Sequence, residues 1–272
     1  MKIHYKYLQI VLLVLSTMLG IQPLAKAAAI SFPSLSQDSF DKAIREFTAN
    51  SYLHSVTPAS SMGSIFGFEV GLIAGITKTP EIDALVQANS GTSVSMLPHA
   101  GLLGALTIPF GITAEVVLVP KTDMGDLKYQ QFAGALKWTA TDSVLSMLPL
   151  NLAVRGFLSQ TQLSYTQTIS SVDSTVTIDD QVMGLQLLAS PKLIPIIEPY
   201  IGVGMLSGKG KMDVSGTSTL FNFTTAQSAE SSPSSSQLFM GIEARLLLLT
   251  FGVEYSRAFE TDSYTGKFSL KF

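Results

Sequence analysis

The sequence contains no cysteine among its 272 residues, and it has only three histidines and one tryptophan. The absence of cysteine excludes disulfide bonds, a thiol nucleophile, thiolate metal ligands and the lipid-bearing cysteine of a lipoprotein. Charged residues make up 14% of the chain and hydrophobic residues 46%, yet no apolar run beyond Ala29 is long enough for a membrane-spanning helix. Apolar residues that are abundant but thinly spread are typical of a barrel whose outer surface faces lipid.

The first 27 residues have the layout of a secretory signal peptide. Lys2 and Lys6 precede an apolar run of about a dozen residues from Leu8 to Leu19, and Ala25-Lys26-Ala27 forms a small-x-small cleavage site. The run is shorter than the roughly 20 apolar residues of a membrane-spanning helix, so a transmembrane anchor is the weaker alternative. We therefore expect export, with cleavage after Ala27 or, as the alternative, after Ala29.

The expected mature chain carries no basic excess. Without Lys2, Lys6 and Lys26, the 17 basic residues become 14 against 20 acidic residues, a formal charge of −6. Nucleic-acid binding requires a clustered basic face, so we expect no nucleic-acid partner. The remaining length suits one all-β domain. We expect an N-terminal segment at residues 28–61 and one barrel domain at residues 62–272.

Hydrophobic and polar residues alternate with a period of two over segments of about 9 to 11 residues. In the last segment, Tyr264, Phe268, Leu270 and Phe272 share one face, and Thr265, Lys267, Ser269 and Lys271 share the other. Nine further segments show the same pattern, with lipid-facing residues expected within Phe66–Ile76, Leu102–Ile108, Phe110–Leu118, Phe132–Trp138, Leu150–Leu158, Met183–Leu187, Ile197–Met205, Leu238–Leu248 and Phe251–Tyr255. The sequence therefore predicts an antiparallel transmembrane β-barrel of about ten strands, with eight or twelve as alternatives.

The connections between these segments are alternately long and short. The expected long loops are Thr77–Val94, Pro120–Leu127, Gln160–Thr177 and Gly208–Ser236, and the short links are Ile108-Pro109, Ala140–Pro149, Ser190–Pro195 and Leu249-Thr250. Extracellular loops and periplasmic turns alternate in this way in outer-membrane barrels, so we expect both termini on the periplasmic side. A soluble periplasmic β-sandwich is the alternative fold. Its strands would carry one strongly polar face, whereas the second faces here are mostly Gly, Ala, Thr and Ser.

The signal peptide, the ten segments and the aromatic last strand together resemble bacterial outer-membrane β-barrel proteins, from about Met62 to Phe272. In that class a C-terminal Phe after alternating apolar residues resembles the signal that the barrel-insertion machinery reads, which implies this role for Tyr264, Phe268, Leu270 and Phe272. Blocks such as Phe66-Gly67-Phe68-Glu69, Leu97–Gly101 and Glu198–Gly202 look like those of an uncharacterised outer-membrane family. The resemblance implies an outer-membrane location and contact with its lipids, and it leaves the activity open.

The second face of the strands carries charges of both signs. Alternation places five acidic and five basic side chains inside the barrel, namely Glu69, Glu115, Glu198, Glu243, Glu254, Lys137, Arg155, Arg245, Lys267 and Lys271. An unpaired charge in a narrow lumen is costly, so this balance predicts ion pairs across the lumen. Such a network serves either a narrow selective channel or a closed, structurally stabilised barrel, and about ten strands lie near the filled end of the range.

An amphipathic helix is expected at about residues 37–49, ahead of the first strand. Phe40, Ala43, Ile44 and Phe47 recur at helical spacing, and charged residues occupy the other positions. One hypothesis is that Phe40, Ile44 and Phe47 plug the lumen or cap its periplasmic mouth. The alternative is a helix lying at the membrane interface.

Residues that could carry out catalysis are few, and we expect neither an enzyme nor a cofactor or metal site. His54 and His99 are too few for a histidine-rich metal site. His99 could meet Asp179 or Asp180 at the extracellular rim, near Ser95, but this spacing is not diagnostic. Trp138, Tyr255 and Tyr264 fit aromatic girdles, and the loop within Gly210–Ser236 has the composition of a flexible surface loop.

The leading functional hypothesis is a narrow channel or transporter for small or amphiphilic solutes of unknown identity. The first alternative is a closed barrel that stabilises the envelope or presents loops to a partner. The second alternative is an outer-membrane hydrolase.

Overall fold

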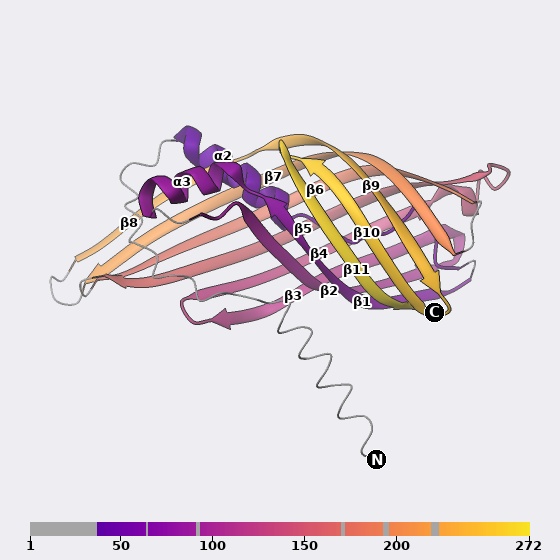
Figure 1. The fold of residues 1–272 in the computed structure, drawn as a ribbon, viewed down its shortest axis with the longest axis horizontal. Helices are drawn as coiled ribbons and strands as arrows, with labels where there is room; N and C mark the ends of the chain where they lie inside the picture. The colour runs from indigo at the N-terminus through magenta and orange to yellow at the C-terminus, as the bar shows by residue number, and fades with distance from the viewer. Residues whose placement is uncertain (1–36, 64, 91–92, 170–171, 193–195, 219–222) are drawn as a thin grey trace, which may run out of the picture.

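The alternating segments form a closed antiparallel β-barrel in the computed structural model, which describes residues 37–272 except 64, 91–92, 170–171, 193–195 and 219–222 (Figure 1). The strand order is β6-β5-β4-β3-β2-β1-β11-β10-β9-β7, and β6 pairs with β7 to close the ring. The prediction of a ten-stranded antiparallel barrel with a short N-terminal helix is therefore confirmed. The expected signal peptide, residues 1–27, lies outside the described residues.

Each of the ten barrel strands overlaps one of the ten predicted segments, and several strands extend well beyond it. Their bounds are β1 (Gly67–Lys78), β2 (Met96–Ile108), β3 (Ile112–Met124), β4 (Leu127–Thr139), β5 (Leu150–Ile169), β6 (Val172–Pro191), β7 (Ile197–Ser218), β9 (Ser234–Leu246), β10 (Leu249–Ala258) and β11 (Thr261–Lys271). The last strand pairs with the first, with Glu69 opposite Lys271 and Ile76 opposite Tyr264. The terminal segment therefore closes the barrel against its beginning.

One further strand, β8 (Phe223–Ser231), continues the line of β9 beyond the barrel wall. The first part of β7 pairs with β9 up to Ser207, and the part from Gly210 onward pairs with β8. Pro233 lies in the gap between β8 and β9, and its carbonyl accepts a hydrogen bond from Gly208 N. Proline has no N–H to give to a ladder, which accounts for the interruption at this point.

The two ends of the barrel differ. The turn end carries η2 (Pro109–Gly111), η3 (Ala140–Asp142), the Leu247-Leu248 turn and Phe272, whereas the loop end carries α3 (Pro80–Ser90) and β8. Figure 1 shows the helices and β8 at the end opposite the C-terminus. Because short turns face the periplasm in outer-membrane barrels, the loop end is the extracellular end.

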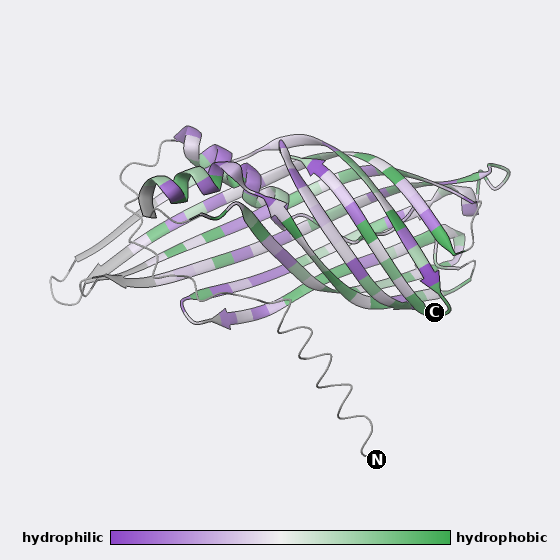
Figure 2. Cartoon of the chain, viewed as in Figure 1, coloured by the Kyte–Doolittle hydropathy of each residue, from purple (hydrophilic) through white to green (hydrophobic). Residues whose placement is uncertain are grey.

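The outer surface of the barrel is apolar around its girth. Outward side chains such as Phe68, Leu102, Leu136, Leu185 and Phe251 are each about 40 to 65% exposed, and their inward neighbours are buried. Figure 2 shows the hydrophobic positions alternating with polar ones along the strands. None of the helices in the described part of the chain is long and apolar enough to cross a membrane.

Three of the expected long loops are largely strand, which corrects the sequence-based boundaries. Within Gln160–Thr177, β5 and β6 pair continuously from the barrel outward, with Thr166 opposite Thr175. Within Gly208–Ser236, β7 runs on to Ser218 and pairs with β8, so the described part of the expected flexible loop is mostly paired strand. Within Pro120–Leu127, β3 continues to Met124. Above the membrane the outward faces of these strands meet water instead of lipid, so they lack the outward apolar residues that mark the strands within it.

The helix α2 (Gln37–Ser51) lies at the loop end, and an extended segment, residues 52–62, descends from it through the lumen to β1. We call this segment the strap. Residues 52–59 are all buried. The expectation that both termini lie on the periplasmic side is therefore wrong for the described N-terminal part, because the strap carries it through the barrel to the opposite end.

Candidate functional site: the occupied lumen

Helix α2 is held at the extracellular mouth through its apolar face. Phe40 and Ile44 are buried against Met212 of β7, and Phe47 is also buried. These three residues are thus at the loop end and not at the periplasmic mouth. On the polar side, the Glu46 carboxylate accepts hydrogen bonds from Glu81 N and Ile82 N at the start of α3, at 2.8 and 2.9 Å. Burial raises the pKa of Glu46, although these two backbone donors act in the opposite direction.

The end of α2 is fixed to the lumen wall by polar side chains. Asp180 of β6 accepts hydrogen bonds from the hydroxyls of Thr48, at 3.0 Å, and Ser51. The Ser51 carbonyl accepts from Gln131 Nε2 and from the Ser159 hydroxyl, both at 2.6 Å. These contacts use one helix turn to join β4, β5 and β6, so the upper end of the strap begins from a fixed point.

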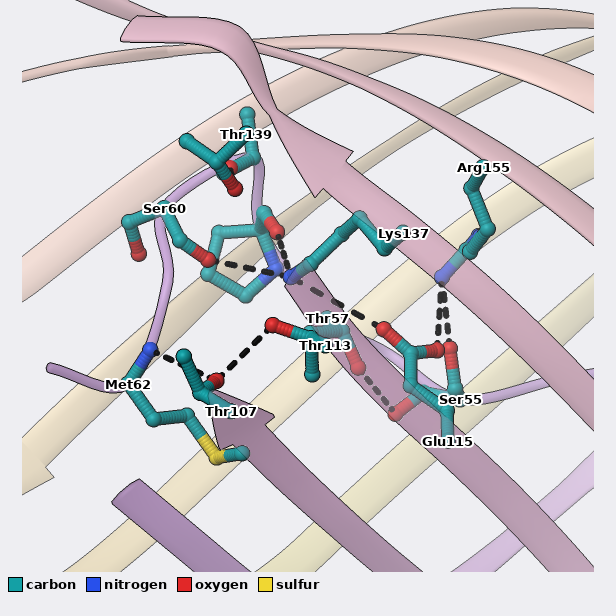
Figure 3. Close-up of polar contacts among 12 residues, drawn as sticks. Ser55, Thr57, Ser60, Met62, Thr107, Thr113, Glu115, Lys137, Thr139 and Arg155 are labelled. Carbon is teal, nitrogen blue, oxygen red and sulfur yellow. Dashed lines mark hydrogen bonds and ion pairs between the residues drawn. The ribbon is translucent and has the colours of Figure 1, made fainter. Parts of the chain in front are cut away.

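The lower half of the strap is held through its main-chain oxygens. Lys137 Nζ donates to the carbonyls of Pro58 and Ser60, at 2.8 and 3.0 Å. The Thr139 hydroxyl donates to the Ala59 carbonyl at 2.8 Å. The strap therefore presents three consecutive acceptors to one strand, β4, and Figure 3 shows both side chains reaching toward it.

A buried ion cluster lies beside these contacts, at mid-depth in the lumen. Glu115 of β3 faces Arg155 Nη1 at 3.3 Å and Lys137 Nζ at 3.7 Å, and the three side chains are essentially unexposed. Arg155 also donates to the Ser55 hydroxyl of the strap at 2.6 Å and to Gln186 at 2.6 Å. One carboxylate therefore neutralises two cations, and both cations also hold the strap (Figure 3).

A second ion cluster spans the seam between the first and last strands. Lys267 of β11 lies between Glu69 of β1, at 2.8 Å, and Glu243 of β9, at 2.6 Å. Glu243 also pairs with Lys271. The Ser269 hydroxyl donates to Glu69. Two acids and two bases thus join β1, β11 and β9 inside the lumen, across the intervening strand β10, where burial makes an unmatched charge costly.

Three of the ten residues expected in the lumen network form no ion pair among the described residues. Glu198 is half-buried and accepts hydrogen bonds from Ser60, Asn151 and Ser190. Glu254 is buried and accepts from the Tyr200 hydroxyl at 2.8 Å. Arg245 lies near the turn end, where its Nε donates to the Leu247 carbonyl. Alternation identified the inward positions of these residues but could not tell how far along the lumen each one lies.

Both histidines of the described chain lie in the upper lumen, where their rings stack with centroids 4.1 Å apart. His99 lies between Asn50 Oδ1, at 3.1 Å from Nδ1, and Thr265 Oγ1, at 2.9 Å from Nε2. Tyr52 packs against His54 with the rings tilted by 35° and their centroids 4.1 Å apart, and it is hydrogen-bonded to Ser256 at 2.6 Å. The aromatic stack thus joins the strap to β2, β10 and β11.

The proposed rim pair of His99 with Asp179 or Asp180 is not present. His99 is buried and bonded to Asn50 and Thr265, whereas Asp180 binds α2 and Asp179 accepts from Gln162 on the outer surface. Ser95 is exposed at the start of the ladder. The prediction treated His99 as a rim residue because nothing in the sequence indicated that the end of α2 and the strap fill the lumen beside it. Among the described residues, no group of three or more His, Asp or Glu side chains is arranged to hold a metal ion.

The large apolar and aromatic residues at the C-terminal end of the chain face outward. Tyr264, Phe268, Leu270 and Phe272 are each 42 to 49% exposed. Phe272 stacks on Phe68 of β1 with centroids 5.1 Å apart. Tyr264 packs against Tyr255 at 5.4 Å, and Trp138 is exposed on β4 at the turn end. These positions are those of an amphiphilic strand whose apolar side contacts lipid.

The strap itself was missed from the sequence. Its residues are apolar and polar in irregular order, and Pro58 removes any strand signal, so no period marks it. The only available hint was negative: Tyr52, Leu53 and Val56 are apolar residues with no predicted element to bury them. Gln131, Ser159 and Thr139 were missed for a related reason, because uncharged inward residues look alike whether or not they bind a strap.

A closed barrel with an apolar outer band and a polar, charge-paired interior defines the class of the molecule, which is an outer-membrane β-barrel protein. The chain belongs to a family of unknown function, DUF6588, whose profile matches residues 21–269. No curated protein matches the sequence.

Several solved outer-membrane proteins are similar in structure. The translocator domain of the autotransporter NalP from Neisseria meningitidis shares 9% identity, with 77% of this chain and 89% of that chain covered and a TM-score of 0.43. The attachment invasion locus protein Ail of Yersinia pestis shares 10% identity, with 76% and 97% covered and a TM-score of 0.32. The outer-membrane protease OmpT of Escherichia coli shares 10% identity, with 81% and 98% covered and a TM-score of 0.39. At these values the likenesses carry no functional conclusion.

Proposed function

We propose that the protein is a narrow outer-membrane channel for small or amphiphilic solutes, in which the strap and helix α2 occupy the lumen in the resting state. The observation that carries this proposal is the way the strap is held. Lys137 and Thr139 bind its main-chain carbonyls, and Gln131 binds the Ser51 carbonyl where it joins α2, by hydrogen bonds that water or a polar solute can replace. A segment held in this way can leave the lumen without breaking a covalent bond.

The wall behind the strap has the mixed character that an amphiphilic solute requires. Apolar side chains including Leu103, Val117, Phe157 and Leu206 form one buried cluster with Tyr52 and Leu53 of the strap. The two ion clusters lie beside it. Withdrawal of the strap would expose this apolar surface next to fixed charges, which together suit a molecule with an apolar body and a polar group.

A disulfide lock gives the decisive experiment, because the chain has no cysteine of its own. Val56 Cγ1 of the strap lies 2.8 Å from the position that a Cβ on Gly252 of β10 would occupy. A Val56→Cys/Gly252→Cys pair is therefore within reach of a disulfide. In planar bilayers we expect the wild type to show brief openings, the oxidised pair to show none, and reduction to restore them.

Deletion of residues 28–61 should give a sustained conductance. The single variants Val56→Cys and Gly252→Cys are the matched controls, and heat-modifiable gel mobility reports whether each barrel has folded. If the folded deletion variant and the reduced pair do not conduct, the channel proposal is wrong. That result would favour the second candidate, a closed barrel in which the buried ion clusters and the strap serve stability alone.

A further inference from the structure

A polar groove of about 660 Å³ lies on the outside of the barrel, across β3 to β7 near the loop end. Cross-strand pairing arranges its outward side chains in two rows. The first row runs Leu118, Phe132, Gln160, Gln181 and Lys209. At one height along the barrel wall, the side chains of this row therefore change from apolar on β3 and β4 to amide on β5 and β6 and to basic on β7.

The second row lies one step further toward the loop end, and it is entirely polar. It runs Gln130, Gln162, Asp179 and Lys211, and Lys121 lies in the irregular part of β3 beside Gln130. Gln130 Nε2 donates to Gln162 at 3.1 Å, and Gln162 Nε2 donates to Asp179 at 2.8 Å. The side-chain amides are therefore aligned across neighbouring strands.

The positive charges of this groove are only partly neutralised. Lys211 pairs with Asp213 at 2.9 Å. Lys121 and Lys209 have no ion-pair or hydrogen-bond partner within the part of the chain that the structure describes, and both are exposed. On another part of the wall, by contrast, Lys78 and Arg257 both bind Asp262, at 3.0 and 3.4 Å.

The height of the groove determines which molecules can reach it. The outward row directly below it, toward the turn end, is Gly134, Leu158, Met183 and Ser207, and the row after that includes Leu136, Leu185 and Met205 of the apolar band. The groove therefore lies at the level of the lipid headgroups on the extracellular side. Its apolar lower edge, Leu118 and Phe132, continues the surface that contacts acyl chains.

We propose that this groove binds the phosphorylated sugar headgroup of a glycolipid in the outer leaflet. Lys121 and Lys209 bind phosphate, because an ammonium group is a strong donor to phosphate oxygens. Gln130, Gln160 and Gln181 offer paired donors and acceptors to sugar hydroxyls. The first acyl carbons lie on Phe132. A soluble anion has no apolar part to contact Leu118 and Phe132. A phospholipid without a sugar has no hydroxyl groups to form hydrogen bonds with the glutamine side chains.

The test uses the full-length protein in detergent, with rough-type lipopolysaccharide, the same lipid after enzymatic removal of its phosphates, and phosphatidylglycerol as separate probes. The variant is Lys121→Gln/Lys209→Gln, and the matched control is Lys78→Gln/Arg257→Gln. Binding is followed by native mass spectrometry, and heat-modifiable mobility checks folding. Each basic side chain near an anionic lipid surface contributes about 1 kcal/mol, or about fivefold, so the affinity for lipopolysaccharide should fall about 30-fold in the variant and less than threefold in the control.

Replacement of Gln160 and Gln181 by Leu separates the sugar contacts from the charges. We expect this variant to lose its preference for lipopolysaccharide over phosphatidylglycerol while it retains binding to both. Equal binding of lipopolysaccharide and phosphatidylglycerol by the wild type would overturn the sugar assignment. Unchanged lipopolysaccharide affinity in the folded Lys121→Gln/Lys209→Gln protein would overturn the site. Neither outcome depends on whether the lumen conducts.

Discussion

Replacement of Glu115 by glutamine should be among the most destabilising changes in the lumen. Within the described part of the chain, Glu115 is the only acid within ion-pair distance of Lys137 and Arg155, at 3.7 and 3.3 Å. Its neutralisation leaves two neighbouring buried cations with no carboxylate in direct ion-pair contact. Removing one partner of a buried ion pair costs about 3 to 5 kcal/mol.

The local hydrogen bonds place the expected cost near the lower end of that range. Lys137 keeps the carbonyls of Pro58 and Ser60, and Arg155 keeps Gln186 and Ser55. Each cation therefore retains some solvation by protein dipoles. We expect Glu115→Gln to reduce the free energy of unfolding by about 3 kcal/mol.

Urea unfolding from lipid vesicles, followed by fluorescence of the only tryptophan, Trp138, measures this loss. The matched variant Lys137→Met should cost less, about 1 to 2 kcal/mol, because Arg155 still neutralises Glu115. The double variant Glu115→Gln/Lys137→Met should be more stable than Glu115→Gln alone, since only one cation remains. A loss below about 1 kcal/mol for Glu115→Gln, or no recovery in the double variant, would refute the two-cation account.

Three further predictions concern the frame around the lumen. Gly202→Ala should destabilise the barrel by about 1 to 3 kcal/mol, because the new Cβ would lie 2.1 Å from Cζ of Phe239 on β9. The control is Gly156→Ala on the outward face, where the new Cβ would meet nothing within 4 Å. This control should be neutral in the same urea assay. Leu247→Gly should raise the free energy of unfolding by about 1 kcal/mol, because Leu247 has a φ of 57° in a two-residue turn; a decrease would contradict this reading. The hydrogen bond from the Ser93 hydroxyl lowers the pKa of Asp83 in the folded protein. The ionised Asp83 therefore stabilises the segment around α3 fully above the ordinary carboxyl pKa. This stabilisation is lost as the pH falls through the lowered pKa of Asp83 in the folded state. Proteolysis of residues 80–95 should therefore increase in acid in the wild type, and it should be pH-independent in Asp83→Asn.

The barrel could be predicted from the sequence because each strand position is set by its own surroundings, lipid on one face and the lumen on the other. Each outward side chain must be apolar where it meets lipid, so a period of two marks every strand inside the membrane, as in Phe132, Leu136 and Trp138. The same reasoning fails above the membrane. There the outward positions of β5, β6 and β7 are polar, and the few inward apolar residues such as Ile178 and Met212 pack on α2 instead of following a lipid-facing pattern. The pairing of these extensions depends on neighbours that the sequence does not order.

The lumen was only partly accessible to sequence reasoning. The inward direction of Glu115, Lys137 and Arg155 follows from alternation, but the sharing of one carboxylate between two cations depends on the stagger of three strands. The strap contacts depend on a segment without any period. His99 illustrates the difference: its strand was predicted, while its burial beside His54 required the path of the strap to be known.

The strap also constrains how the molecule can assemble. A closed ring of strands has no lateral entrance, and α2 at the loop end is continuous with β1 through residues 52–62. In one assembly route, helix α2 and the strap pass through a ring of strands that is already closed. In the other route, β11 pairs with β1 only after the strap already lies between the strands. The second route needs no threading. In it, the Lys267–Glu69 ion pair forms as β11 and β1 close the ring around the strap. In that order of events the strap is in place first, and the strands of the barrel assemble around it.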